Sequence, residues 1–230
     1  MLIAEDLLLL LTDDGTGKLR MPAVQVDFAL AGANLIELTL MNRVELAWDG
    51  PKDKGGRVVV RDPAPTGDDV LDAALEALIA DDRKKPQAAV KKLAKNARER
   101  LYERLAARGA LRSERARMLG LFPRHTWPAE DARHEAEVRR SITDTLVRGT
   151  PPDTHTAALI ALLHALRCEQ EVVDFRQHGM SKGDLRARAA EIAIGNWAAE
   201  AVRKTIDAML AAVVAANAAA VSTVVLPGAR

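Results

Sequence analysis

Apolar segments of helical length, separated by glycine and proline, run through almost the whole chain. Within them apolar residues recur at three- and four-residue steps, as in Val90, Leu93, Ala97 and Leu101, which is the spacing of one buried helix face. Breakers such as Gly109 predict where the helices end. We expect helices over residues 2–11, 22–40, 70–80, 86–108, 129–148, 156–175 and 185–221, the last as one or two helices.

Two short segments interrupt this helical pattern. Residues 43–48 and 57–61 have strand character and are joined by a segment rich in glycine, proline and aspartate, which predicts a hairpin. Residues 118–122 form a short apolar segment. A turn at 123–125 is expected to fold this segment back as another hairpin. With 48% apolar residues the chain can bury a sizeable core. The fold class is therefore mainly α, a single globular helical domain over residues 1–230 with a small β-hairpin element.

The chain lacks the residues that are characteristic of several classes of function. Cys168 is the single cysteine, so the chain has no internal disulfide and no cysteine metal cage. The five histidines are scattered outside any zinc-binding spacing, and we expect neither a metal nor a cofactor. Gly15-Thr-Gly-Lys18 resembles the end of a phosphate loop, but Thr12 and Leu19 stand where the motif needs glycine and Ser or Thr. We therefore expect a non-enzymatic protein.

Two apolar stretches could be taken for targeting or membrane segments. Leu7–Leu11 follows Glu5 and Asp6 rather than basic residues, which is the opposite of a signal peptide. The stretch 208–226 is rich in alanine and contains Asn217, so a helix buried in protein fits it better than a membrane span. We expect a cytoplasmic protein whose membrane contact is peripheral.

Positive charge is concentrated in one segment of a nearly neutral chain. Residues 83–117 hold 13 Lys or Arg and three Glu, a net charge of +10, whereas the whole chain carries +1 and the remainder therefore −9. On a continuous helix Lys91, Lys95 and Arg98 share one face beside Tyr102. This face is either solvated and paired with the acidic remainder, or a site for a polyanion such as nucleic acid or a lipid headgroup.

An apolar tip follows the basic helix. Leu119, Leu121 and Phe122 suit a peripheral membrane protein, in which basic residues attract headgroups and the tip enters the interface. The alternative is that this hairpin packs on the core or on another subunit.

The order and spacing of several segments resemble the Golgi phosphoprotein 3 family. The segments are Leu7–Leu11 with the turn at Asp13 and Gly15, Leu35-Ile-Glu-Leu-Thr-Leu40 followed by Arg43, Pro63-Ala-Pro-Thr-Gly-Asp68 with Leu71-Asp72 and Ala74-Leu75, Asn96-Ala-Arg-Glu-Arg-Leu101 with Gly109, and Leu159-Ile-Ala-Leu-Leu-His-Ala165. The resemblance implies a helical bundle surrounded by amphipathic helices, covering the chain as one domain.

The resemblance also implies a function. Eukaryotic members bind phosphatidylinositol 4-phosphate at the Golgi and recruit the cytoplasmic tails of glycosyltransferases. Their two basic pocket residues fall on Lys95 and Arg98, and their apolar hairpin, which contacts the bilayer and helps oligomerisation, falls on 119–122. The chain departs from the family where Pro22 and Ala31 replace a pocket tryptophan and arginine.

We therefore expect binding of an anionic phospholipid at a membrane surface, with phosphatidylinositol 4-phosphate as a candidate. The residues expected at the headgroup are Lys95, Arg98, Lys91, Lys18 and Arg20, of which the last two are near enough in sequence to replace the missing pair. A homo-oligomer is a further expectation, and no protein client is predicted. The alanine- and arginine-rich composition indicates a bacterial origin, so the Golgi sorting role is not carried over.

Two other functions remain open. A basic helix followed by a hairpin also describes a winged-helix nucleic-acid-binding protein. A soluble scaffold whose basic face binds an acidic protein would bind neither vesicles nor DNA.

Overall fold

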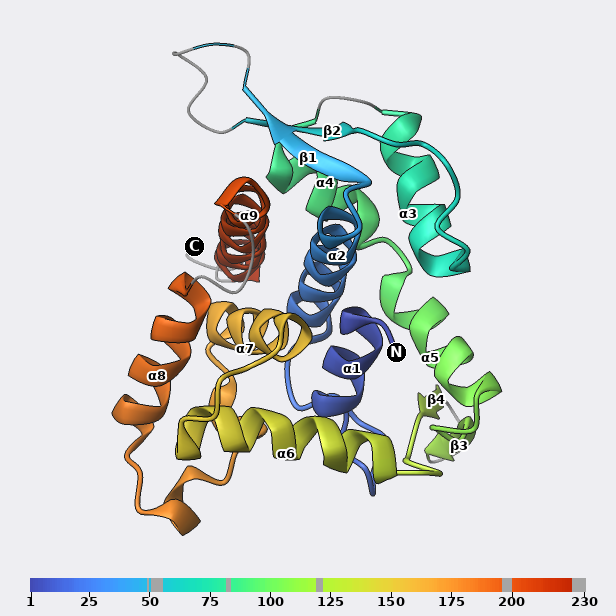
Figure 1. The fold of residues 1–230 in the computed structure, drawn as a ribbon. Helices are drawn as coiled ribbons and strands as arrows, with labels where there is room; N and C mark the ends of the chain where they lie inside the picture. The colour runs from blue at the N-terminus through green and yellow to red at the C-terminus, as the bar shows by residue number, and fades with distance from the viewer. Residues whose placement is uncertain (49, 51–55, 82–83, 119–121, 196–199, 225–230) are drawn as a thin grey trace, which may run out of the picture.

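The structure, a computed structural model, describes residues 1–230 except 49, 51–55, 82–83, 119–121, 196–199 and 225–230. Helices make up most of it (Figure 1). They are α1 (Ile3–Leu10), α2 (Ala23–Leu40), α3 (Asp69–Ile79), α4 (Pro86–Leu93), α5 (Ala97–Ala107), α6 (Arg133–Arg148), α7 (Thr154–Leu166), α8 (Lys182–Ile194) and α9 (Glu200–Val224). Two 3-10 turns, η1 (Glu169–Glu171) and η2 (Phe175–His178), follow α7. The predicted mainly α fold with a small hairpin element is confirmed.

The core is built around helices α2 and α7. Residues 29–36 of α2 and 156–163 of α7 are buried on every side, because these helices carry almost no polar face there. Helix α2 contacts α1, α4, α7 and α9 (Figure 1). By length and composition α2 is the one described helix that could cross a bilayer, but most of it is buried inside the protein, as a core helix is.

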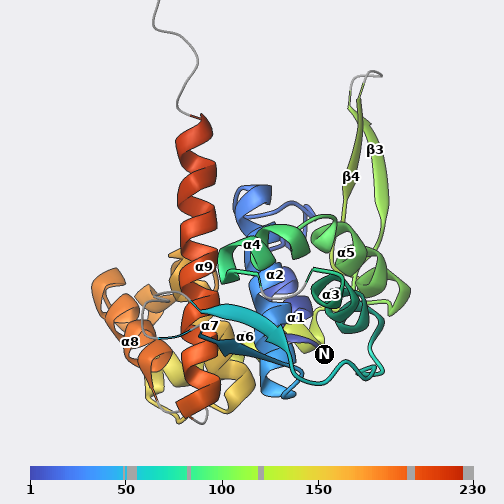
Figure 2. The ribbon, with the colours of Figure 1, turned by 90° about the horizontal axis from the view of Figure 1, so that it is seen from above.

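Two antiparallel hairpins accompany the helices. Strands β1 (Val44–Ala47) and β2 (Arg57–Val60) pair as predicted and lie over one end of α2 and α4 (Figure 1). Strands β3 (Glu114–Met118) and β4 (Phe122–Thr126) pair with Met118 opposite Phe122. The expected turn at 123–125 was wrong, since those residues belong to β4 and the chain reverses between Met118 and Phe122. The second hairpin projects away from the helical body (Figure 2).

The predicted single helix over 86–108 was wrong. Residues 94–96 form a turn, and Asn96 has a left-handed backbone conformation with φ of 60°, which ends α4 and lets α5 start in a new direction. Asparagine is among the few residues that adopt this conformation readily. The helix predicted over 156–175 likewise ends early, at Leu166, where Arg167 is left-handed with φ of 59°.

Two buried carboxylates at the start of α1 connect it to three other helices. Glu5 is fully buried and forms ion pairs with Arg104, through Nε at 2.9 Å, and with Arg108, through Nη1 at 2.9 Å. Asp6 is 3% exposed and bonds Nε2 of His134 at 2.7 Å and Nε2 of His155 at 2.8 Å. Carboxylates are favourable in the first turn of a helix, and these two also tie α5, α6 and α7 to α1.

The Asp6–His155 bond predicts a pH dependence of stability. The hydrogen bond to Asp6 raises the pKa of His155 above its usual value of 6.5. The stabilisation is therefore complete below about pH 6.5 and is lost as the pH rises through the folded-state pKa. Between about pH 6 and about pH 9, the melting temperature of the wild type should fall by a few degrees more than that of His155→Gln, because the glutamine side chain does not titrate. Parallel melting curves for the two proteins would contradict this role of His155.

Candidate functional site

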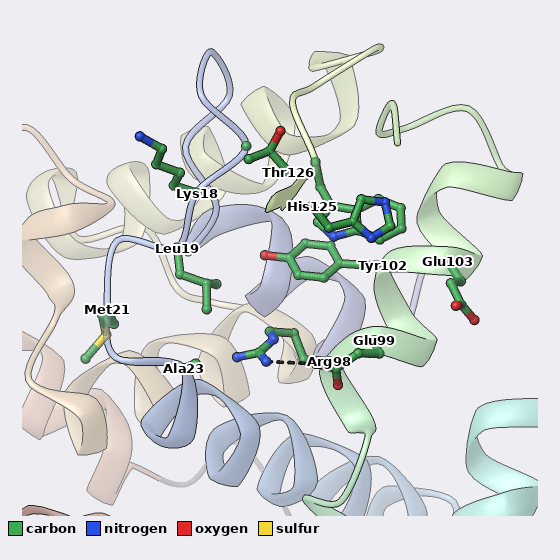
Figure 3. Close-up of a pocket in the computed structure, with 12 residues that line it drawn as sticks. Lys18, Leu19, Met21, Ala23, Arg98, Glu99, Tyr102, Glu103, His125 and Thr126 are labelled. Atoms are coloured by element: carbon green, nitrogen blue, oxygen red, sulfur yellow. Dashed lines mark hydrogen bonds and ion pairs between the residues drawn. The ribbon is translucent and has the colours of Figure 1, made fainter. Parts of the chain in front are cut away.

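A pocket of about 460 Å³ lies where the α1–α2 loop, α5 and the base of the β3–β4 hairpin meet (Figure 3). The loop and the start of α2 contribute Gly17, Lys18, Leu19, Met21 and Ala23; α5 contributes Arg98, Glu99, Tyr102 and Glu103; the hairpin base contributes His125, Thr126 and Trp127. Three segments far apart in the sequence therefore form one site.

Aromatic rings form one wall of this pocket. The rings of Tyr102 and Trp127 are stacked, with centroids 5.1 Å apart and planes within 7°. His125 also packs against Trp127, with ring centroids 4.1 Å apart. The Tyr102 hydroxyl is hydrogen-bonded to the Thr12 hydroxyl at 2.9 Å, which fixes the wall to the end of α1. The hairpin base is thus held rigidly against α5.

The α1–α2 loop packs directly on the hairpin base through Gly17. The Trp127 N–H donates to the Gly17 carbonyl at 3.1 Å, and a Cβ on Gly17 would lie 2.2 Å from the Trp127 nitrogen. Gly17 also has φ of +59°, which favours glycine. Asp13 accepts hydrogen bonds from the Thr16 N–H and hydroxyl, and the backbone bond is the main cause that lowers the pKa of Asp13. The sequence thus builds a tight, closed loop.

Arg98 is the cation inside the pocket. Its side chain is 18% exposed and lies 3.6 Å from Asp27 Oδ1, through Nη1, and 2.8 Å from Glu99 Oε1, through Nη2. The Nη1 atom is buried and makes no hydrogen bond with a described residue, and the same holds for Asp27 Oδ1. Burial raises the pKa of Asp27 to about 6, although Arg98 lowers it. The Arg98 guanidinium therefore has a donor that makes no hydrogen bond with a described residue, and its ion pair with Asp27 is long.

The other residues predicted at the headgroup are divided among separate places. Lys18 lies at the rim of the pocket, exposed and without a described side-chain partner (Figure 3). Arg20 pairs with Asp13 of its own loop at 3.2 Å. Lys95, in the turn before α5, lines a different cavity beside α3, and Lys91 is exposed on α4. The left-handed Asn96 separates Lys91 and Lys95 from Arg98, which a continuous helix would have placed on one face.

Much of the concentrated positive charge is used inside the protein. Arg104 and Arg108 bind Glu5, Lys84 and Lys92 bind Asp81, and Arg112 binds Glu114 and Glu130. Exposed cations without an ion-pair partner in the described part of the chain remain at Lys85, Lys91, Lys95 and Arg100. The basic segment therefore serves partly in folding and partly as a positive surface.

The predicted apolar tip of the hairpin lies outside the part of the chain that the structure describes. Leu119 and Leu121 lie outside the described residues, and so does the side chain of Phe122. The backbone of the two strands shows that the hairpin extends outward from the pocket wall (Figure 2).

The described residues offer no metal site and no reactive thiol. Among them, no group of three or more His, Cys, Asp or Glu residues is placed to hold a metal ion. Burial raises the pKa of the Cys168 thiol, which keeps it protonated and unreactive. His164 bonds Glu169 at 2.8 Å, as expected of a histidine satisfied within the fold.

Sequence reasoning missed the aromatic wall of the pocket, although it placed Tyr102 beside Arg98. The contact of Tyr102 with Trp127 depends on tertiary packing, and the two-residue step from His125 to Trp127 does not by itself indicate a site. Asp27 lies on helix α2, which was predicted from the apolar residues of that segment. No sequence pattern indicated that Asp27 lies beside Arg98. The sequence did indicate a glycine-rich turn at Gly17, directly after α1. It did not indicate that this turn packs against Trp127 at the hairpin base.

A comparison with known protein families finds a match over most of the chain. The model of Golgi phosphoprotein 3 (GPP34) matches residues 3–209. No curated protein matches the chain.

Proposed function

The chain belongs to the Golgi phosphoprotein 3 family, and on this premise we propose that it is a peripheral membrane protein that binds an anionic phospholipid headgroup in the Arg98 pocket. Phosphatidylinositol 4-phosphate is the first lipid to test. We propose that it acts without catalysing a reaction, on the cytoplasmic side of a membrane.

The observation that carries this proposal is the unused Nη1 of Arg98 inside a pocket at the base of a projecting hairpin. Guanidinium groups form strong, charge-assisted hydrogen bonds with phosphate. A phosphate that takes the place of Asp27 beside Arg98 would satisfy Nη1, and Lys18 at the rim could move its flexible side chain toward the same group. Met21 and Ala23 line the pocket on either side of Pro22, which replaces the family's tryptophan. Arg98 and the neighbours of Pro22 thus support this pocket as the headgroup site, whereas Lys95 lines another cavity.

The geometry of the hairpin supports the same location. Strand β4 has five residues, which span about 17 Å at roughly 3.3 Å per residue, and its last residues, His125 and Thr126, line the pocket. A headgroup layer is only about 5–8 Å thick, so the tip and the pocket can contact the same membrane surface if the hairpin lies obliquely to it.

Vesicle co-sedimentation tests the proposal. Wild type should bind vesicles that carry phosphatidylinositol 4-phosphate, and should bind neutral vesicles much less, at ~150 mM salt. Arg98→Ala/Lys18→Ala should reduce binding at least tenfold. Arg140→Ala/Lys182→Ala, which removes the same two charges from exposed positions on α6 and α8, should leave it unchanged. Equal binding by both double variants would overturn the pocket as the site.

Phe122→Asp distinguishes a lipid site from a nucleic-acid site. A charge at the hairpin tip should abolish vesicle binding, because it opposes entry into the apolar interface. A nucleic-acid-binding protein would instead retain DNA binding in this variant and lose it when exposed cations such as Lys91 are removed. DNA binding at ~150 mM salt that exceeds vesicle binding would favour the winged-helix alternative.

Asp27→Asn should strengthen headgroup binding. Asp27 lies 3.6 Å from Arg98 and competes with a bound phosphate for the same guanidinium. Its neutralisation should raise the affinity at about pH 7 on the order of tenfold, which corresponds to ~1.4 kcal/mol. The control Glu191→Gln removes an exposed carboxylate from α8 and should have no effect. An unchanged or weaker affinity of Asp27→Asn would mean that the phosphate does not use Arg98.

A further inference from the structure

A second cavity, of about 630 Å³, lies between α3 and the α4–α5 turn. Its size is within the range of small-molecule sites. Helix α3 lines it with Ala73, Ala74 and Ala77, Ala80 follows directly after the helix, and Leu93 of α4 adds to the apolar wall. The small side chains of α3 leave the space unfilled, so the cavity has an elongated apolar side.

The α4–α5 turn gives the cavity a positive rim. Lys95 and Arg100 line it, are exposed, and form no ion pair with a described residue. Lys92 is already bound to Asp81 at 3.0 Å, and Glu76 is the acidic residue in the lining. Two cations therefore remain available to an anionic group.

A buried amide in the lining also lacks a partner. Asn34 of α2 is 4% exposed, and its Oδ1 makes no hydrogen bond with a described residue. Buried side-chain amides are nearly always hydrogen-bonded, because an unpaired polar group in the interior is unfavourable. The amide of Asn34 can offer either its oxygen or, after rotation, its nitrogen to a ligand in this cavity.

We propose that this cavity binds a single-chain amphiphile with an anionic head. The head pairs with Lys95 and Arg100 and hydrogen-bonds the Asn34 amide, and the hydrocarbon chain lies along the alanines of α3. The head is either the carboxylate of a free fatty acid or the phosphate of a single-chain phospholipid. The site is separate from the Arg98 pocket, and neither proposal depends on the other.

The proposal predicts a dependence on both chain and charge. Burial of each further methylene group should strengthen binding by about fourfold until the cavity is filled. A cationic amphiphile of the same chain length should bind far more weakly, because Lys95 and Arg100 repel it.

Isothermal titration calorimetry of the full chain tests this. The ligands are octanoate, decanoate and dodecanoate, dodecyl phosphate, and dodecyltrimethylammonium, each kept below the concentration at which it forms micelles. Comparison of dodecanoate with dodecyl phosphate distinguishes the two kinds of head. The variants are Ala77→Trp, which fills the cavity, and Lys95→Ala/Arg100→Ala, which removes its exposed cations. Their controls are Ala107→Trp, at an exposed position of α5, and Arg140→Ala/Lys182→Ala, the exposed pair on α6 and α8.

We expect one anionic molecule to bind per chain, with at least tenfold weaker binding in both cavity variants and unchanged binding in both controls. Circular dichroism shows whether Ala77→Trp keeps its helices, and the double variant alters exposed side chains alone. The proposal is overturned if no anionic amphiphile binds, if the cationic one binds equally well, or if Lys95→Ala/Arg100→Ala binds like wild type.

Discussion

Replacement of Arg104 by alanine is expected to lower the free energy of unfolding by about 3–5 kcal/mol. Arg104 is 11% exposed and joins three carboxylates: fully buried Glu5 of α1, Asp68, which caps α3, and exposed Asp69. Its removal leaves Glu5 with Arg108 as its remaining cation, and removal of one partner from a buried pair leaves a charge in a poorly solvating interior. For a chain of this length the melting temperature should fall by about 10 °C.

Urea denaturation checks this prediction, with Arg100→Ala as the matched control. Arg100 lies on the same helix but is exposed and without a described ion-pair partner, so its replacement should change the unfolding free energy by less than ~0.5 kcal/mol. Arg104→Lys should fall between the two, because an ammonium cannot reproduce the forked contacts to Asp68. A loss of stability in Arg100→Ala equal to that in Arg104→Ala would show that total charge, rather than the buried network, determines stability.

Gly17→Ala is expected to lose both stability and headgroup binding, although it changes no charge. The added Cβ would lie 2.2 Å from the Trp127 nitrogen and 2.4 Å from the Pro128 nitrogen, so backbone would have to move. The left-handed conformation costs a non-glycine residue a further ~1–2 kcal/mol. We expect a loss of about 2–4 kcal/mol in unfolding free energy. Binding to anionic vesicles should weaken at least tenfold, because the loop wall separates from the hairpin base.

Gly15→Ala is the control within the same loop. Its Cβ would meet no atom closer than 3.8 Å, and Gly15 does not have a positive φ. Stability should stay within ~0.5 kcal/mol of the wild type, with unchanged vesicle binding. If Gly17→Ala binds vesicles as well as Gly15→Ala does, the contact between loop and hairpin base is not part of the site.

The fold was largely predictable because most helices carry their own signals. Apolar residues at helical spacing located α1, α2, α3 and α7, and glycine or proline marked several of their ends. What the sequence could not indicate was the break at Asn96, since asparagine within a helical pattern is compatible with helix continuation. That single left-handed residue changes which basic residues share a surface.

The candidate site was predicted less completely. Arg98 was identified by charge and by the family pattern, and it does line a pocket. Charge counting could not show that Arg104 is used in a buried network or that Asp27 lies beside Arg98, because both depend on contacts between distant segments. The aromatic wall arises in the same way, from Tyr102 of α5 and Trp127 of the hairpin base.

Nuclear magnetic resonance titration with a water-soluble, short-chain phosphatidylinositol 4-phosphate tests the central claim most directly, since it reports the site without a membrane. We predict saturable shifts of the backbone amides of Gly17, Lys18 and Trp127, with Asn34 and Arg100 unaffected, and the loss of these shifts in Arg98→Ala/Lys18→Ala. Unchanged spectra of Gly17, Lys18 and Trp127 at saturating lipid, or shifts that persist in the double variant, would contradict headgroup binding in the Arg98 pocket.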